Sequence, residues 1–166
     1  MLKIRITIII AFFIGLFISC GSDDTCRQNM YVAMRVRFYQ QTTDSETGAV
    51  GTGTLTLDSL TVKGVGVDSV LINNQKKRSD VNVFLKRFKN ETLYVFTFND
   101  INDTLTILHQ NEEELLSFEC GYLTTYTLDT VYHTTHYIDS IAIKSRTVNA
   151  TSNEENLSIY KYITAE

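Results

Sequence analysis

Hydrophobic and polar residues alternate with a period of two along most of this chain, and almost no stretch shows the 3.6-residue period of a helix. In residues 31–39 every second residue is apolar, while Arg35 and Arg37 occupy the opposite face. Successive side chains of a strand point to opposite faces, so the pattern predicts a strand with one face against a core. The apolar positions are Val32, Met34, Val36 and Phe38.

Residues 92–98 are apolar on both faces, which predicts a strand in the middle of a sheet. A turn at 99–103 then separates this segment from an alternating run at 104–109, as in a hairpin. The acidic run 112–114 fits either a charged turn or the start of a short helix. Further strands are expected at 53–57, 59–63, 69–72, 81–85, 115–120, 123–128, 131–137, 141–144 and 157–162. Roughly eight to ten short strands with turns between them predict an all-β fold, an antiparallel β-sandwich.

The start of the chain has the pattern of a lipoprotein signal peptide. Lys3 and Arg5 precede an apolar run over 6–18, which is shorter than the ~20 residues that a membrane-spanning helix needs. The segment 16–20 resembles the bacterial lipobox, whose cysteine is acylated before the leader is cut off. Acyl chains on Cys20 would hold a soluble domain to a membrane. The expected organisation is a signal peptide over 1–19, a lipidated tether over 20–25 and a β-sandwich domain over 26–166.

The charge of the chain argues against a nucleic-acid partner. Removal of residues 1–19 takes two of the 15 basic residues and none of the 19 acidic ones, which leaves a net charge of −6. Binding to phosphates would require a basic stripe, and the basic residues near 76–78 and 86–89 form only two small clusters. The remaining 147 residues are enough for one domain with a substantial core.

Two further cysteines, Cys26 and Cys120, remain beside Cys20. In an exported protein, two cysteines that remain after acylation of the first favour a disulfide between them. The closed loop would span 94 positions. A loop of that size stabilises a protein by roughly 4–5 kcal/mol in the chain-entropy view. The bridge would also shorten the tether, so we expect the domain to sit close to the membrane.

A triplet of Asp, Ser or Thr, and an aliphatic residue occurs five times, beginning at positions 58, 68, 103, 129 and 139. One interpretation is structural: the Asp side chain caps a turn and a β-branched residue begins the next strand. The other is that the triplet resembles the O-glycosylation sequon of Bacteroidota. The acceptors would then be Ser59, Ser69, Thr104, Thr130 and Ser140. The two interpretations are compatible, because turns are exposed.

The residues after the lipobox, Ser22, Asp23 and Asp24, are similar to the acidic export signal of some Bacteroidota lipoproteins. The segments 58–66, 117–122 and 138–141 resemble a family of small Bacteroidota lipoproteins of unknown function. This resemblance implies a tethered β domain at the outer membrane, in the periplasmic or the surface-exposed leaflet, with an outer-membrane barrel protein as the expected partner. It implies no activity.

Motifs for catalysis or metal binding are lacking in the sequence. His133, His136 and Asp139 have the spacing of metal ligands, but residues three apart on a strand point to opposite faces. No Gly-x-Ser-x-Gly elbow and no calcium-binding loop occur. We therefore expect no metal, no cofactor and no catalytic residue.

Four tyrosines, at 122, 126, 132 and 137, lie in the later third of the chain. Exposed, they would form a platform for sugar rings or a protein partner; buried, they would belong to the core. Tyr122 and Tyr126 are the candidate ligand-binding residues. The expected role is a non-catalytic, lipid-anchored envelope protein that acts as a binding or accessory module at the outer membrane. The alternative is a surface glycan-binding module.

Overall fold

The computed structural model describes residues 32–68, 70–118, 120–151 and 153–164, which form eleven strands and no helix. No helix with the length and apolarity needed to cross a bilayer occurs in this described part of the chain. The strands are β1 (Met34–Thr43), β2 (Val50–Thr54), β3 (Leu60–Gly64), β4 (Val70–Gln75), β5 (Asp80–Val83), β6 (Glu91–Phe98), β7 (Ile101–Ser117), β8 (Gly121–His133), β9 (Ser140–Ile143), β10 (Thr147–Val148) and β11 (Leu157–Thr164).

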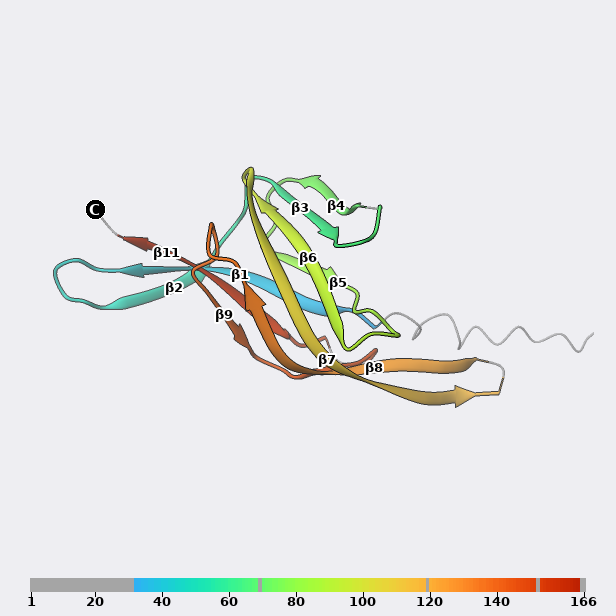
Figure 1. The fold of residues 1–166 in the computed structure, drawn as a ribbon. Helices are drawn as coiled ribbons and strands as arrows, with labels where there is room; N and C mark the ends of the chain where they lie inside the picture. Colours follow the sequence, from blue (N-terminus) through green and yellow to red (C-terminus); the bar gives the residue numbers. More distant parts are fainter. Residues whose placement is uncertain (1–31, 69, 119, 152, 165–166) are drawn as a thin grey trace, which may run out of the picture.

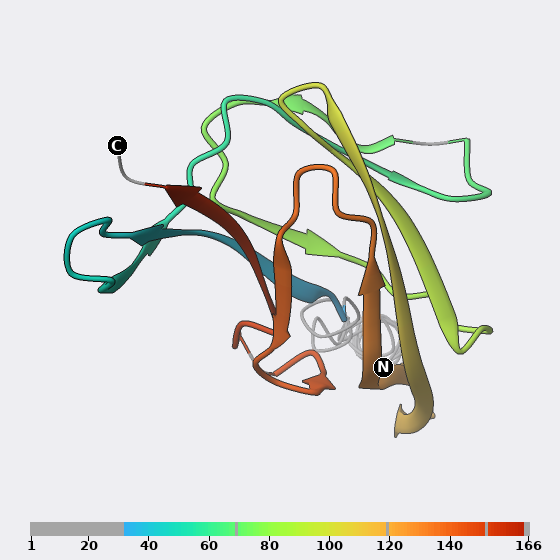
Figure 2. The same ribbon diagram turned by 60° about the vertical axis from the view of Figure 1, so that its left-hand side comes forward.

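The strands form two curled sheets that pack against each other (Figures 1 and 2). The first sheet has the order β2-β1-β11-β9, and β5 also pairs with β1. The second sheet has the order β10-β8-β7-β6-β3-β4. This sandwich-like, all-β arrangement confirms the predicted fold class.

Strand β1 lies in the middle of the first sheet, with its apolar positions on the core side as predicted. Met34, Val36 and Phe38 are buried, whereas the alternate positions Arg35 and Arg37 are only half-buried. One edge of β1 pairs with β5 and then with β2, both antiparallel. The other edge pairs with β11 in parallel, so the sheets are not purely antiparallel. Apolar and polar residues alternate in the same way in parallel and in antiparallel strands, so the sequence pattern could not reveal that β1 and β11 are parallel.

Strand β6 occupies the middle of the second sheet, between β3 and β7, which confirms its predicted central place. Its side chains Phe96 and Phe98 are fully buried. Phe38 of the first sheet meets Phe98 edge-on at 5.7 Å, and Tyr137 stacks on Phe98 at 4.8 Å between ring centroids. Burial of each such ring contributes about 1.5–3 kcal/mol, so this aromatic cluster holds the two sheets together.

Strands β7 and β8 form one long hairpin of 17 and 13 residues, where the sequence predicted four short strands. Residues 112–114, predicted as a turn or a short helix, lie inside β7 and pair with 123–125. The three glutamates fit a strand because this half of the hairpin extends beyond the body, so both faces of β7 are open to solvent there (Figure 1).

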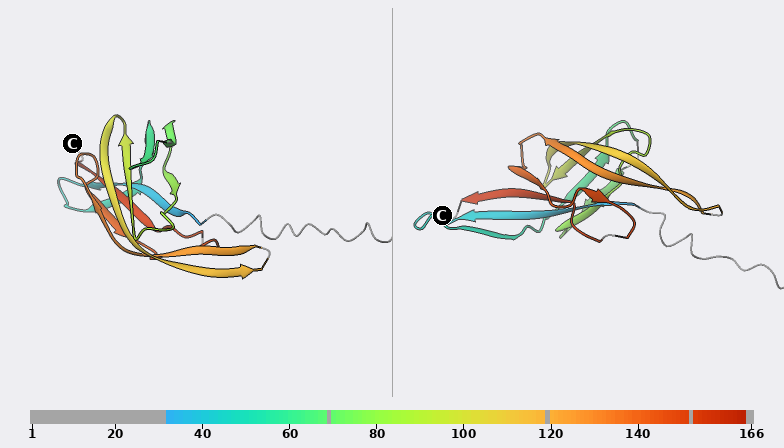
Figure 3. Two further views of the ribbon diagram at one scale, coloured as in Figure 1. Left: turned by 45° about the vertical axis from the view of Figure 1, so that its right-hand side comes forward. Right: turned by 90° about the horizontal axis from the view of Figure 1, so that it is seen from below.

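The long hairpin also defines the two ends of the molecule. Its tip projects on the side where β1 begins, and all views agree on this (Figures 1 and 3). The turn between β1 and β2 and the last residues of β11 lie on the opposite side.

Candidate functional site

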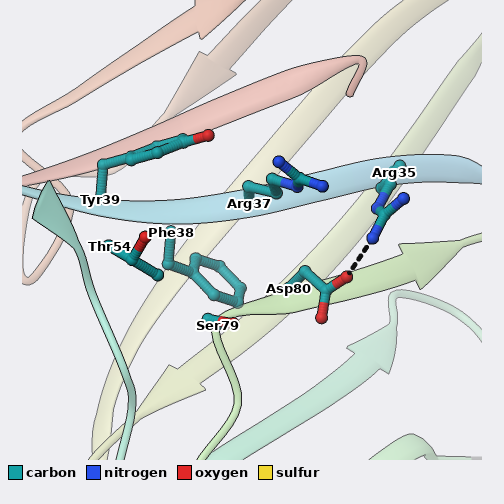
Figure 4. Close-up of a pocket in the computed structure, with 7 residues that line it drawn as sticks. All are labelled: Arg35, Arg37, Phe38, Tyr39, Thr54, Ser79 and Asp80. Atoms are coloured by element: carbon teal, nitrogen blue, oxygen red, sulfur yellow. Dashed lines mark hydrogen bonds and ion pairs between the residues drawn. The ribbon is translucent and has the colours of Figure 1, made fainter. Parts of the chain in front are cut away.

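Two surface hollows flank strand β1, each with a volume of about 210 Å³. The first, here called the outer groove, lies on the solvent side of the first sheet (Figure 4). The second, the tyrosine pocket, opens at the end where β1 begins. The outer groove is lined by Arg35, Arg37, Phe38, Tyr39, Thr54, Ser79 and Asp80, and the tyrosine pocket by Val32, Phe84, Leu85, Arg87, Tyr122, Leu123, Thr124 and Tyr126.

The outer groove is charged because alternate residues of β1, Arg35 and Arg37 among them, point to the solvent side of the sheet. Arg37 and Tyr39 rise from one side of the strand, and Phe38 points to the other (Figure 4). Arg35 makes an ion pair with Asp80 at 2.9 Å. The ion pair between Arg37 and Glu155 is longer, at 3.8 Å, and the Arg37 side chain is 43% exposed. The Arg37 guanidinium is therefore the group in this groove most open to an acidic ligand.

An aromatic pair continues the outer groove along the first sheet. Tyr39 on β1 stacks on Tyr160 of β11, with ring centroids 5.5 Å apart. The Tyr39 hydroxyl donates a hydrogen bond to Glu155 Oε2 at 2.7 Å, and this bond raises the pKa of Tyr39 above its usual value. The combination of flat rings, a guanidinium and carboxylates is suited to binding a polar molecule.

The tyrosine pocket brings the two predicted ligand-binding residues together. Tyr122 and Tyr126 stand four positions apart on β8, both in the wall of this hollow. Tyr126 is 6% exposed, and its hydroxyl donates to the carbonyl of Leu85 at 3.2 Å. Burial raises the pKa of Tyr126. Tyr122 is 56% exposed, so it forms the accessible rim of a pocket whose inner wall is Tyr126.

Thr124 adds an unsatisfied polar group to the same pocket. Its side chain is 7% exposed, and its hydroxyl has no hydrogen-bond partner among the described residues. A buried hydroxyl without a partner costs about 1–3 kcal/mol. The hydroxyl oxygen exposes less than 1 Å² of surface, so a ligand could bind it only if the pocket wall shifted locally.

A polar network fixes the loop 84–90, which forms one wall of the tyrosine pocket. The Thr92 hydroxyl accepts a hydrogen bond from the Lys86 N–H at 2.8 Å and donates to His109 Nε2 at 2.8 Å. His109 Nδ1 donates to Asn111 Oδ1 at 2.7 Å. The amide nitrogen of Asn111 donates to two carbonyls of the loop, at 2.7 and 2.8 Å. Because Asn111 must donate to these carbonyls, its oxygen accepts and His109 carries its proton on Nδ1.

Burial of His109 lowers the pKa of its imidazole, against the opposing effect of the hydrogen bond with Asn111. The neutral imidazole is the form that this network requires, because Nε2 must accept the Thr92 proton. The sequence offered no sign of this network. Thr92 lies 17 positions from His109 and 19 from Asn111, and these residues come together because β6 pairs with β7.

Several predicted sites lie outside the described residues. These are Cys20, Ser22, Asp23, Asp24, Cys26 and Ser69. Cys120 lies in the turn between β7 and β8 and is disulfide-bonded. Its pairing with Cys26 stays a prediction, since Cys26 is not described.

The other predicted glycan acceptors are spread over the surface and do not gather at either hollow. Thr130 is exposed on β8, while Ser59, Thr104 and Ser140 are half-buried. Thr104 lies within β7 and not in a turn. Glycosylation of these residues stays a prediction.

The aspartate of one triplet has a clear structural role. The carboxylate of Asp103, which is 1% exposed, accepts hydrogen bonds from the segment that follows β8. The donors are the Thr134 hydroxyl at 2.5 Å, the His136 N–H at 2.9 Å, the Tyr137 N–H at 2.7 Å and the Ile138 N–H at 2.8 Å. The turn that Asp103 caps is thus more than 30 positions away in sequence.

His136 also directs its Nδ1 to Asp103 at 3.0 Å, whereas His133 Nδ1 contacts the Thr134 carbonyl at 2.8 Å. In the described part of the chain no group of three or more His, Cys, Asp or Glu side chains is arranged to hold a metal ion.

Sequence comparison adds a family and no activity. Residues 59–161 match a family described as "Family of unknown function (DUF6452)", a match over more than half of the chain. Strands β1 and β2 precede the matched residues. No curated protein and no solved structure matches the chain.

Proposed function

We propose that this chain, which belongs to the Family of unknown function (DUF6452), is a non-catalytic, lipid-anchored binding module of the outer membrane. The anchor is the acylated thiol of Cys20, and the leader 1–19 is removed. Support for the anchor comes from the basic and apolar leader, the lipobox-like segment 16–20 and the acidic residues that follow it. The resemblance to small Bacteroidota lipoproteins supports the same location.

The observation that carries the binding role is the tyrosine pocket. It combines an exposed ring at Tyr122, a rigid wall at Tyr126 and the unsatisfied hydroxyl of Thr124. Exposed aromatic rings beside a buried polar group are typical of sites that hold a partner side chain or a small polar molecule. We propose that this pocket receives an envelope partner, with an outer-membrane barrel protein as the expected one.

A photo-crosslinking amino acid placed at Tyr122 tests the binding role in intact cells. We expect a covalent adduct with one envelope protein. The matched control is the same replacement at Tyr132, which lies on β8 with a similar exposure of 59% against 56% but does not line the pocket. Adduct formation at both positions alike, or at neither, would contradict the proposal.

The anchor is tested separately with Cys20→Ala. We expect this variant to lose incorporation of radiolabelled palmitate and to leave the membrane fraction. The control is Cys120→Ala, which removes a disulfide-bonded cysteine but not the proposed acyl acceptor. Unchanged palmitate labelling of Cys20→Ala would refute the anchor.

A glycan-binding role is the second candidate, and the outer groove favours it. Arg37 and the stacked pair Tyr39 and Tyr160 place a donor beside two flat rings, which is a surface that sugar rings can stack on. Binding to a glycan array that is lost with Tyr39→Ala and kept with Tyr132→Ala would support this role. A blank array would leave the protein-binding role as the better account.

A further inference from the structure

Five large apolar side chains are exposed at the end of the molecule where β1 begins. Two belong to the loop between β5 and β6, and three to the tip of the β7–β8 hairpin. We call this group the aromatic end: Phe84 (43% exposed), Phe88 (85%), Leu115 (47%), Leu116 (39%) and Phe118 (95%). Apolar side chains gathered at one place on a surface generally mark a contact with another apolar phase.

The loop and the hairpin are held beside each other by side-chain contacts. Arg87 makes an ion pair with Glu113 of β7 at 3.0 Å and lies 5.5 Å from the centre of the Phe88 ring. Asn111 of β7 donates to carbonyls of the same loop. These contacts hold the loop against the hairpin, so the two segments of the aromatic end lie at the same end of the molecule.

The shape of the aromatic end favours a fluid partner. Its apolar residues lie on a loop and on a hairpin that projects from the body (Figure 1), and Phe118 belongs to the turn between β7 and β8. Phe88 and Phe118, at 85% and 95% exposure, have no complementary wall of their own. Such a projection can enter the interfacial layer of a bilayer, where aromatic rings are favoured, without any fitted surface on the other side.

The charges around the aromatic end permit such a contact. Lys86, Arg87 and Lys89 lie in the loop, and their charge offsets that of the glutamates at 112–114. This end is therefore close to neutral, although the chain as a whole has a formal charge of −4.

The position of the proposed anchor points the same way. Val32 lies in the wall of the tyrosine pocket, next to Phe84 and Tyr122. Cys20 precedes Val32 by twelve positions, a distance of at most about 40 Å for a fully extended chain. A bilayer that holds Cys20 is thus within reach of the aromatic end.

We infer that the aromatic end is a membrane seat: Phe88 and Phe118 insert into the lipid interface and orient the anchored domain. This inference rests on the proposed lipid anchor for its orientation. With the seat in the bilayer, the tyrosine pocket opens close to the headgroups, where it can meet a membrane-embedded partner, and the β1–β2 turn faces away from the membrane.

Single tryptophan reporters test the seat, because the sequence contains no tryptophan. Phe118→Trp and Phe88→Trp report on the aromatic end. Val50→Trp is the matched control, since Val50 is also exposed (62%) but lies at the opposite end. Each variant is made in the chain from residue 20 onward, with Cys20→Ser and an N-terminal hexahistidine. It is then bound through nickel-chelating lipid to phosphatidylethanolamine and phosphatidylglycerol vesicles.

We expect the emission of Phe118→Trp and Phe88→Trp to shift to shorter wavelength on the vesicles. Quenching by brominated lipid should be roughly twofold or more stronger than for Val50→Trp, because only inserted rings approach the bromine atoms. Equal quenching at the two ends would overturn the seat. An emission shift that grows with protein concentration without vesicles would overturn it in favour of contact with a second copy.

This design separates the seat from the anchor. The nickel-chelating lipid supplies proximity to the bilayer whether or not cells acylate Cys20. Failure of palmitate labelling in cells would therefore refute the anchor alone, and absence of quenching on vesicles would refute the seat alone.

Discussion

Asp103 is a buried charge that is stable because its hydrogen bonds outweigh its burial. Burial alone would raise the pKa of this carboxyl, but hydrogen bonds from the Thr134 hydroxyl and from the N–H groups of residues 136–138 lower it to about 2, from 3.8. A folded-state pKa below the unfolded value means that the stabilisation is present above about pH 4. It is lost as the pH falls toward 2.

We therefore expect the free energy of unfolding to fall by about 2 kcal/mol between pH 4 and pH 2 through Asp103. Asp103→Asn should lower stability at pH 7 by roughly 2–4 kcal/mol and remove this part of the acid sensitivity, because the amide offers one acceptor oxygen instead of two. Urea denaturation across this pH range measures both effects. Asp58→Asn, at an exposed aspartate, should leave stability and pH dependence unchanged; an equal effect there would contradict the account.

His109 gives the molecule a second pH dependence, in which a base that is buried neutral becomes charged as the pH falls. Its pKa in the folded state is lowered by burial, so the unfolded chain binds the proton more readily. The free energy of unfolding should therefore decrease as the pH falls below about 6.5, the unfolded value. Thermal denaturation between pH 7.5 and pH 5.5 measures this slope. His109→Gln should flatten it, and His133→Gln should not.

Protonation of His109 also has a local consequence. A proton on Nε2 removes the acceptor for Thr92, which in turn binds the Lys86 N–H of the loop 84–90. Hydrogen exchange of the Lys86 amide should accelerate over the same pH range. An exchange rate without any such acceleration would show that the network does not hold the loop.

At the scale of elements, sequence patterning succeeded where a strand has one buried face. The alternation in 31–39 placed β1 with its apolar side chains inward, and the two-sided apolar run at 92–98 placed β6 in the middle of a sheet. The first result follows from burial of every second residue. In β6 one face is buried, and the other face, with Leu93 and Val95, is half-buried. The predicted limits also agree with β3, β5 and β9 to within a few residues.

Patterning failed where a strand leaves the body. The outer part of β7 has no buried face, so its glutamates at 112–114 looked like a turn, and the hairpin was divided into four pieces. The two-residue β10 pairs only with β8 and was too short to recognise.

Some residues of the candidate sites could be predicted from the sequence, and others could not. The sequence marked Tyr122 and Tyr126, which lie in one pocket, because they stand out by residue type. It gave no indication of Thr124, Arg37 or the aromatic end, because an unsatisfied hydroxyl and an exposed ring are recognised only from their neighbours in space.

Two buried threonines, Thr124 on β8 and Thr92 on β6, provide a matched pair for testing the pocket. Thr124 has an unsatisfied hydroxyl, whereas the Thr92 hydroxyl, 2% exposed, makes two hydrogen bonds. Valine replaces a hydroxyl by a methyl group of similar size. Thr124→Val should raise the free energy of unfolding by about 0.5–1 kcal/mol, and Thr92→Val should lower it by roughly 1–3 kcal/mol.

Urea denaturation of both variants gives these values. A Thr124→Val protein that is less stable than the parent would show that the hydroxyl is already satisfied and would remove that support for the pocket.

At the scale of the whole molecule, the first sheet is closed by the two ends of the described chain. Residues 36–43 of β1 pair with 157–164 of β11, and both strands contribute buried side chains, Phe38 and Leu157 among them. Asn156 reinforces this junction, since its Oδ1 accepts from the Arg35 N–H at 2.9 Å and its amide donates to the Thr147 carbonyl at 2.9 Å.

A chain that ends at Asn156 lacks β11 and leaves one edge of β1 unpaired. We expect it to show no cooperative thermal transition, because β1 would lose the parallel ladder and the core would lose Leu157 and Ile159. Tyr162→Ala, at a 51% exposed position on the same strand, should unfold cooperatively near the parent temperature. Cooperative unfolding of the truncated chain would show that β11 is dispensable for the fold.

Lipid anchoring at Cys20 can be read from the intact mass of the protein purified from its native membranes. The account predicts the mass of residues 20–166 plus a diacylglyceryl group, with or without a further acyl chain on the new amino terminus; glycans on the triplets would add sugar mass to the remainder of the chain. A mass that includes residues 1–19, or an unacylated fragment that begins at Cys20, would contradict the account.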